Sequence, residues 1–441
     1  MPVFLFGIFI SIGYLILLSA LGVARPNLLH YVTFPLFAAF PTWMSLVAFS
    51  SNIAASGLAM LFACAGACAY SLVLARDGNG MSTREWMALA CLCVFCAAGI
   101  GIYQTYLFVV VNLALGVLLV RIQRSPIGLV SIAINVALLL GALIVAIVLY
   151  KTLDLVSLRI VGVDRSGYVG QFLDIGRFLS DPMGMFDIAL SALKRTYGGD
   201  SAYYGVQVQG FQWLMVAGAF GLLLGSGPYR LGERLIVAGI AAFITFSPFV
   251  MHLFSGGMPL RTLVAVPAVV WLFALFGLTC GRRWIEGATV LALTFSLFGL
   301  LHSSSMMQAA DTYRQINDRT LAADIYRRIA EVNPDFDREQ QYVVDIHGAK
   351  SFDSMYPRVW SSTWGYSFFE WDGGNPYFRM LPHMRALGYA NLTLAAPEQR
   401  QENLAHFKGM PTWPAVGSVQ LVNGVTLIKL GNTPGYPFNV R

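Results

Sequence analysis

Long apolar runs separated by short polar connections dominate the first three hundred residues of the chain. An α-helix needs about 20 apolar residues to cross the roughly 30 Å hydrocarbon core of a bilayer. Runs of nearly this length lie at about 3–23, 30–49, 52–75, 86–101, 103–121, 127–150, 211–226, 234–254, 260–280 and 284–301. The pattern predicts an α-helical polytopic membrane protein with about ten transmembrane helices. Because Pro35 and Pro41 interrupt the second run, an alternative is that this run only dips into the membrane.

The short connections between the apolar runs alternate in positive charge. The connections at 51–52, 101–102 and 255–259 carry none, whereas the others hold Arg25, Arg76, Arg84, Arg121, Arg124, Arg230, Arg234, Arg282 and Arg283. The positive-inside rule places the arginine-bearing connections in the cytoplasm. The loop 151–210, the turn 255–261 and everything after about residue 302 then lie outside it. Met1 would lie outside too, so we expect an amino-terminal helix to be missing. Alternatively, if the run at 30–49 does not span the membrane, the first helix has the reverse orientation and Met1 lies in the cytoplasm.

The composition changes after residue 301 to that of a water-soluble domain. Helical periodicity covers 313–332, QYVVDIHG at 341–348 is typical of a strand, and 374–389 begins like a helix at Asn375-Pro376. Two β-prone runs, VGSVQLV and VTLIKL, meet at Asn423-Gly424, which favours a hairpin turn. We therefore predict a transmembrane domain over 1–301 and a small extracytoplasmic α+β domain over 302–441.

The loop 151–210 holds apolar positions at helical spacing between residues 185 and 193, followed by Lys194 and Arg195. This pattern predicts a helix in the membrane interface, or a loop that only covers the bundle.

Composition excludes several classes of protein. Hydrophobic residues make up 56% of the chain and charged residues 12%, against roughly 25% charged residues in soluble domains. The net charge of +6 sits in short clusters between apolar runs, which does not favour a nucleic-acid partner. All six cysteines lie within apolar runs, so we expect neither a disulfide framework nor a metal site from them. The chain has no P-loop and no HExxH motif, and no cytosolic nucleotide-sugar domain with a D-x-D motif, which favours a lipid-linked substrate.

Several segments together resemble a known family. They are GIGIYQTYL (99–107), GGMPLR (256–261), SFFEWDGGNPYFR (367–379) and MPTWPAVGSV followed by LIKL (410–430). Their order resembles the Gtr-type, GtrII-like glucosyltransferases that modify lipopolysaccharide O-antigen. The resemblance implies a GT-C-like membrane glycosyltransferase of the bacterial inner membrane. Such an enzyme takes a hexose from a polyprenyl-phosphate donor and places it on a lipid-linked or lipopolysaccharide glycan in the periplasm.

The resemblance also implies partners and raises a difficulty. Expected partners are the donor, the glycan acceptor, membrane lipids, a flippase for the donor and the enzyme that makes it. Members of the family begin with a further helix and a loop bearing acidic residues thought to be catalytic, and this part is absent here. One alternative is therefore a catalytically impaired, truncated transferase. Another alternative is a lipid or glycan transporter or flippase, which ten helices would also suit.

Transfer from a polyprenyl phosphosugar needs a base for the acceptor hydroxyl, and cations or hydrogen-bond donors for the departing phosphate. Arg261, just after the Gly-Gly-Met-Pro turn, is the first candidate for the phosphate, its alternative role being an interfacial anchor. The resemblance assigns Lys429, in the last apolar strand, as a second contact. On residue chemistry alone Lys429 must find an anion, a polar contact or water, or else serve to protect an edge strand from aggregation.

Sugar hydroxyls could be bound by Tyr103 and Gln104 at a turn between two spans, unless these residues only cap the turn. Glycan binding is also predicted for Glu370, Trp371 and Asp372, because aromatic faces beside carboxylates are a common sugar-binding mixture, although such runs can equally be core. The catalytic base is not identified, and the candidates are Asp154, Asp164 and Asp174. No metal site is predicted, although a divalent cation is possible.

Overall fold

The computed structural model describes residues 1–23, 26–47, 50–74, 80–124, 128–163, 174–225, 231–356, 358–359 and 364–433 of the 441-residue chain. These residues form two compact units. Of the described residues, unit 1 holds 1–304 and unit 2 holds 305–359 and 364–433.

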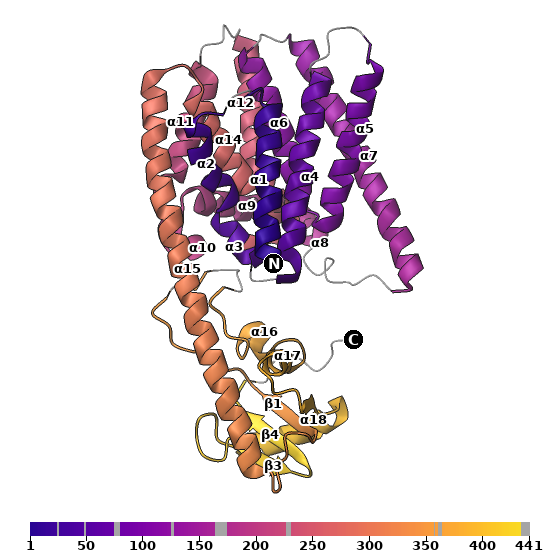
Figure 1. Cartoon of the computed structure of the whole chain (residues 1–441), viewed down its shortest axis with the longest axis vertical. Coiled ribbons are helices and arrows are strands. Elements are labelled where there is room, and N and C mark those ends of the chain that lie inside the picture. The colour runs from indigo at the N-terminus through magenta and orange to yellow at the C-terminus, as the bar shows by residue number, and fades with distance from the viewer. Residues whose placement is uncertain are drawn as a thin grey trace. The chain divides into compact units, whose positions relative to one another are not determined.

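Unit 1 is a bundle of helices (Figure 1). They are α1 (Pro2–Ala20), α2 (Leu28–Ala38), α3 (Pro41–Val47), α4 (Ser50–Leu74), α5 (Thr83–Ile102), α6 (Tyr106–Arg124), α7 (Leu129–Val161), α8 (Ile175–Ser180), α9 (Pro182–Tyr197), α10 (Ser201–Tyr204), α11 (Phe211–Leu224), α12 (Leu231–Phe246), α13 (Val250–Ser255), α14 (Val266–Leu278) and the first half of α15 (Arg283–Val332). Within the described ranges, seven helical stretches are long and apolar enough to cross a membrane, and α11 and α14 are shorter apolar helices.

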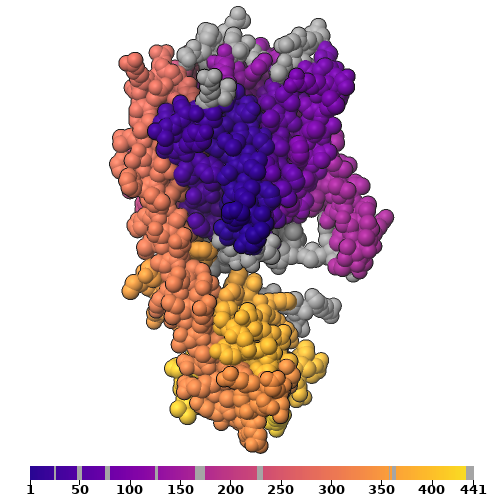
Figure 2. All heavy atoms as spheres, viewed as in Figure 1, coloured from indigo at the N-terminus to yellow at the C-terminus, as the bar shows by residue number. Residues whose placement is uncertain are grey.

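Helix α14 forms the centre of unit 1, since every one of its residues is buried. It packs against α2, α6 and α11, whereas α1 packs against α4 and its atoms form part of the near face in Figure 2. Glycines allow the closest of these approaches. A Cβ added at Gly218 of α11 would lie 2.3 Å from the carbonyl oxygen of Phe273 on α14. Small residues bring membrane helices together in this way.

Helix α9 confirms the helical spacing predicted at 185–193. Met185, Ala189 and Ala192 form its buried face, while Lys194 and Arg195 are exposed. This face packs against α13 and α11, so the segment is an amphipathic helix laid on the bundle.

Three helical segments differ from the prediction. The run 30–49 is not one span but the two short helices α2 and α3, which break where Pro41 disfavours helical backbone at the preceding residue. Helix α7 does not end near residue 150 but continues to Val161, into the predicted loop. The runs 284–301 and 313–332 are not separate helices, because α15 is continuous over 50 residues.

Unit 2 is built on a four-stranded mixed sheet. Its strands are β1 (Tyr342–His347), β2 (Leu392–Leu394), β3 (Val419–Val422) and β4 (Val425–Lys429), in the order β2-β1-β4-β3. Strand β1 pairs in parallel with β2 and β4, and β3 pairs antiparallel with β4. The helices are the second half of α15, α16 (Trp371–Gly374), the π-helical turn η4 (Pro376–Met380), α17 (Leu381–Ala386) and α18 (Pro397–Gly409).

The predicted strand at 341–348 and the terminal hairpin are confirmed. Asn423 and Gly424 have φ values of 49° and 76°, as a tight hairpin turn requires. The side chains of β4 alternate between the two faces of the sheet. Val425 and Leu427 join a cluster with Phe407 of α18, whereas Ile428 joins the core beside α15.

Other parts of unit 2 were predicted less well. The expected helix over 374–389 is divided into η4 and α17, although Asn375 does cap its start by accepting from the backbone N–H of Phe378 at 3.0 Å. Strand β2 and helix α18 were not predicted. Burial of β4 on both faces follows from α18 covering one face and α15 the other.

Candidate functional site

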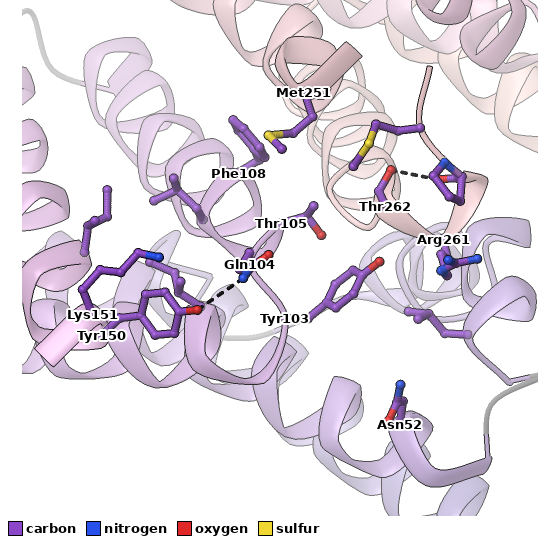
Figure 3. A pocket seen from close by; sticks show the side chains of 16 residues that line it. Asn52, Tyr103, Gln104, Thr105, Phe108, Tyr150, Lys151, Met251, Arg261 and Thr262 are labelled. Carbon is purple, nitrogen blue, oxygen red and sulfur yellow. Dashed lines mark hydrogen bonds between the residues drawn. The ribbon is translucent and has the colours of Figure 1, made fainter. Parts of the chain in front are cut away.

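A pocket of about 500 Å³ opens at one end of unit 1 (Figure 3). Its walls come from α3, the start of α4, the α5–α6 connection, the end of α7, α13 and the turn before α14. Tyr103, Gln104 and Arg261, which were predicted separately, all line it. The structure therefore brings the predicted sugar-binding turn and the predicted phosphate-binding arginine to one cavity.

The α5–α6 connection places Tyr103 and Gln104. Helix α5 ends at Ile102, and Tyr103 turns to extended backbone at φ −157° while its N–H still donates to Gly99 at 3.1 Å. The N–H of Tyr106 then donates to the Tyr103 carbonyl at 3.0 Å and begins α6. The backbone of Tyr103 thus caps the turn between α5 and α6, which is the alternative role predicted for this residue. Both side chains nevertheless line the pocket.

The turn between α13 and α14 places Arg261. Gly256 ends α13 at φ 65° and Gly257 follows at φ 147°, both in a region that glycine adopts without strain. Pro259 then leads into a single 3₁₀ turn over Leu260–Thr262, and the Thr262 hydroxyl donates to the Pro259 carbonyl at 2.8 Å. This short turn holds the half-buried guanidinium of Arg261 at the pocket wall (Figure 3).

The end of α7 supplies a third side of the pocket, which sequence reasoning missed. Ile147, Tyr150 and Lys151 all line the cavity, because residues three and four positions apart share one face of a helix. Gln104 donates through Nε2 to the Tyr150 hydroxyl at 3.2 Å, and Lys151 Nζ lies 5.3 Å from the centre of the Tyr150 ring. The helical position of Lys151 could have been predicted only by continuing the helical pattern of this apolar run past residue 150.

The polar groups of the pocket suit an anion. Its lining includes two cations, Arg261 and Lys151, and no acidic residue among the described positions. Thr105 also lines it, with a side chain that is 7% exposed and an Oγ1 atom that has no hydrogen-bond partner in the described structure. Most of the remaining lining is apolar, including Phe108 and Met251. Such a cavity can hold a phosphate at its polar wall and an apolar chain beside it.

The three predicted candidates for the base differ in their placement. Asp154 lies on α7, half-buried, on the face that also carries Tyr150 and Lys151 and one turn beyond them. Asp174 caps α8, accepting from the backbone N–H of Arg177 at 2.9 Å. Asp164 lies outside the described residues. Of the two described candidates, only Asp154 shares a helix face with pocket-lining residues.

Lys429 lies in unit 2, where its side chain is 6% exposed. Its ammonium donates to the backbone carbonyl of Met410 at 2.8 Å, which is one of the polar contacts that a buried lysine needs. Its role at the donor phosphate stays a prediction.

The predicted glycan-binding residues of unit 2 contact arginines. Glu370 Oε1 accepts from Arg358 at 2.8 Å, and Asp372 accepts from Arg379 at 2.8 Å. The Arg379 guanidinium also lies 3.7 Å from the centre of the Trp371 ring. Asp372 has a φ of 55°, a strained conformation for a residue other than glycine. The carboxylates and the indole are thus held in place by ion pairs and by stacking on a cation.

Across the described ranges, no three or more His, Cys, Asp or Glu side chains lie close enough together to hold a metal ion.

Comparison with known proteins identifies a family. The family model described as glucosyl transferase GtrII matches residues 1–278, the part of the chain that contains every residue lining the pocket. No curated protein and no solved structure is significantly similar to the chain.

Proposed function

Because the chain belongs to the glucosyl transferase GtrII family and carries helices apolar enough to span a membrane, we propose that it transfers glucose from a polyprenyl-phosphate carrier to a glycan outside the cytoplasm. The family makes the protein a glycosyltransferase, and the apolar helices make it a membrane protein. The donor, the acceptor and the side of the membrane belong to the proposal.

One observation carries the proposal: the mouth of the pocket combines cations with an apolar wall. A polyprenyl phosphosugar has the complementary chemistry, with an anion between a long apolar chain and a sugar. Arg261 binds the phosphate through its planar fork of donors. Tyr103 and Gln104 offer hydroxyl and amide groups to the sugar. Leu107 and Phe108, in the first turns of α6, contact the first isoprene units.

The reaction breaks the bond between the anomeric carbon and the phosphate oxygen, and the electron pair stays with the phosphate. The acceptor oxygen forms the new bond to the anomeric carbon, and its proton passes to a carboxylate. We assign that role to Asp154, since its position on α7 is one turn beyond Lys151 on the same face. A positioned base typically contributes about two to four powers of ten in rate.

Unit 2 supplies the acceptor-binding surface in this proposal. Trp371 and the carboxylate of Asp372 both contact Arg379, and Tyr377 offers a further exposed aromatic ring. Aromatic rings with neighbouring polar groups suit the alternating apolar and hydroxyl faces of a glycan.

The test is transfer by purified protein. Radiolabelled polyprenyl-phosphoglucose and an O-antigen-type glycan in detergent should yield labelled glycan and free polyprenyl phosphate. Arg261→Gln should lower kcat/KM by about two to three powers of ten, as removal of one transition-state donor does elsewhere. Arg195→Gln is the matched control, because this guanidinium on α9 is 51% exposed and does not line the pocket. Movement of the donor between leaflets without any labelled glycan would instead indicate a transporter.

A further inference from the structure

The pocket contains a second cation that the proposed reaction has not yet used. Lys151 is the last residue of α7 that lines the pocket, whereas Arg261 lies in the 3₁₀ turn before α14. The described residues that line the pocket include no Asp or Glu. The cavity therefore offers two positive groups to whatever occupies it.

A buried hydroxyl points to a ligand at the same place. Only 7% of the Thr105 surface is exposed, and its Oγ1 atom has no hydrogen-bond partner in the described structure. Burying a hydroxyl without a hydrogen bond is unfavourable, because the group loses its bonds to water and gains none in return. Figure 3 shows Thr105 beside Gln104 within the pocket. A bound oxygen-rich anion would satisfy this hydroxyl.

The wall between Lys151 and Thr105 is fixed by side-chain contacts. Gln104 donates to Tyr150 at 3.2 Å, which joins the α5–α6 connection to the end of α7. The Lys151 ammonium lies 5.3 Å from the Tyr150 ring, within the range of a cation–π contact. Figure 3 shows Lys151 and Tyr150 on the Gln104 side of the pocket and Arg261 beyond Tyr103 on the other.

We propose that Lys151, with the Thr105 hydroxyl, forms a second phosphate-binding group opposite Arg261, and that it recognises the leaving phosphate more strongly than the donor. This inference rests on the proposed function. In the donor, the phosphate is a diester with a single negative charge. When the anomeric carbon–oxygen bond breaks, the electron pair remains on that oxygen, and the polyprenyl phosphate becomes a dianion. The proton of the acceptor hydroxyl passes to Asp154, so charge and atoms balance.

The second cation therefore meets a charge that develops only as the bond breaks. An interaction that is stronger in the transition state than in the bound donor raises kcat, whereas one that is equal in both changes only KM. Lys151 should consequently act mainly on kcat and on the affinity for the product. Arg261, which contacts the phosphate in both states, should affect donor binding as well.

A phospholipid headgroup has the same phosphate chemistry, so the experiment must separate the two sources. The probe is fluorescent farnesyl monophosphate, titrated into full-length protein in detergent. The competitors are unlabelled farnesyl monophosphate, farnesol and dioleoyl phosphatidylglycerol. For the unchanged protein, farnesyl monophosphate should compete well, and farnesol and the phospholipid should compete poorly.

The variants are Lys151→Gln, Lys151→Arg and Lys194→Gln. Lys151→Gln should weaken binding of the probe about 10- to 100-fold, the range expected for a hydrogen bond to a charged group. Lys151→Arg should retain most of the affinity, because the charge is kept. Lys194→Gln is the matched control, since this lysine is exposed on α9 and outside the pocket. Thermal unfolding of each variant in detergent shows whether the fold is intact.

The outcomes distinguish this inference from the proposed function. Unchanged probe affinity in a folded Lys151→Gln variant would overturn the inference even if the protein transfers glucose. Equal competition by phosphatidylglycerol would also overturn it, because Lys151 would then be an anchor for lipid headgroups. Loss of affinity in Lys151→Gln, restored in Lys151→Arg, would support it even if no transfer were found.

The split between kcat and KM gives a second measurement. Where transfer is observed, Lys151→Gln should lower kcat about tenfold or more while KM for the donor changes little. A merely structural role for Lys151 would instead lower the melting temperature, and a role in donor binding alone would raise KM with kcat unchanged. Either result would contradict the assignment.

Discussion

Replacing His383 with phenylalanine should remove part of the acid sensitivity of unit 2. The His383 ring stacks on Phe368 with ring centres 4.4 Å apart and an angle of 21° between the planes. Burial of this ring, together with the nearby positive charges of Arg314 and Arg319, lowers the pKa of His383 from 6.5 to about 4. The folded protein therefore keeps the imidazole neutral over a pH range in which the unfolded chain would protonate it.

The sign and size of the effect follow from proton linkage. Between about pH 6.5 and pH 4 the unfolded state binds more protons than the folded state, so the free energy of unfolding falls as the pH falls. Each unit of pKa difference corresponds to about 1.4 kcal/mol. The half-buried ring is partly screened by solvent, so we expect a loss of about 2 to 3 kcal/mol by the time the pH has fallen to about 4.

Urea unfolding of full-length protein in detergent, followed by tryptophan fluorescence, measures this loss near neutral pH and at about pH 4.5. Phenylalanine retains the stacking on Phe368 but cannot take up a proton. Burial raises the pKa of Asp318, an effect of opposite sign, but it is present in both proteins and cancels in their difference. His406→Gln, at an exposed position of α18, serves as the control. Equal pH dependence in His383→Phe and the unchanged protein would refute the reasoning.

Three further predictions concern stability. Asp345→Asn should lower the free energy of unfolding of unit 2 by about 3–5 kcal/mol, because the buried guanidinium of Arg400 would lose the carboxylate that it contacts at 2.8 Å. Urea unfolding of the full protein measures this loss, and a change below about 1 kcal/mol would contradict the prediction. Gly218→Ala should lower the melting temperature in detergent at a cost of about 1–3 kcal/mol, since the added Cβ would lie 2.3 Å from a carbonyl oxygen of α14. Gly239→Ala should leave the melting temperature unchanged, because a Cβ added there has no atom within 4 Å. Gly424→Ala should destabilise the hairpin by about 1–2 kcal/mol through its positive φ of 76°, visible as faster amide exchange in β3 and β4.

Hydrophobic periodicity predicted the bundle helices well where an apolar run ended in a charge or a turn. It failed at α7, since the residues after Tyr150 alternate between polar and apolar types and were interpreted as loop, yet they continue the helix to Val161. It failed at α15 for a related reason. The change of composition after residue 301 suggested the end of a helix, but it marks only the change of surroundings from one unit to the other within a continuous helix.

The candidate site shows the same division between local and tertiary information. Tyr103, Gln104 and Arg261 were predicted because each lies beside a turn that the sequence marks. Their convergence on one cavity could not be predicted, because it depends on how α5, α7 and α13 pack. Lys151 was missed because its helix was expected to have ended. The need of Lys429 for a polar contact could be predicted from its residue type, but the identity of that contact depends on the position of the Met410 carbonyl in the fold.

The central claim is that the polyprenyl-phosphate donor binds in the pocket at the end of unit 1. Photo-crosslinking tests it most directly, with a polyprenyl-phosphoglucose analogue that carries a diazirine on its first isoprene unit. After digestion, mass spectrometry should find the label on peptides containing 100–108, 147–151 or 258–262, and excess unlabelled donor should remove it. Label confined to the groove between α11 and α15, where Trp213 and Trp284 are exposed, or to unit 2, would contradict the account.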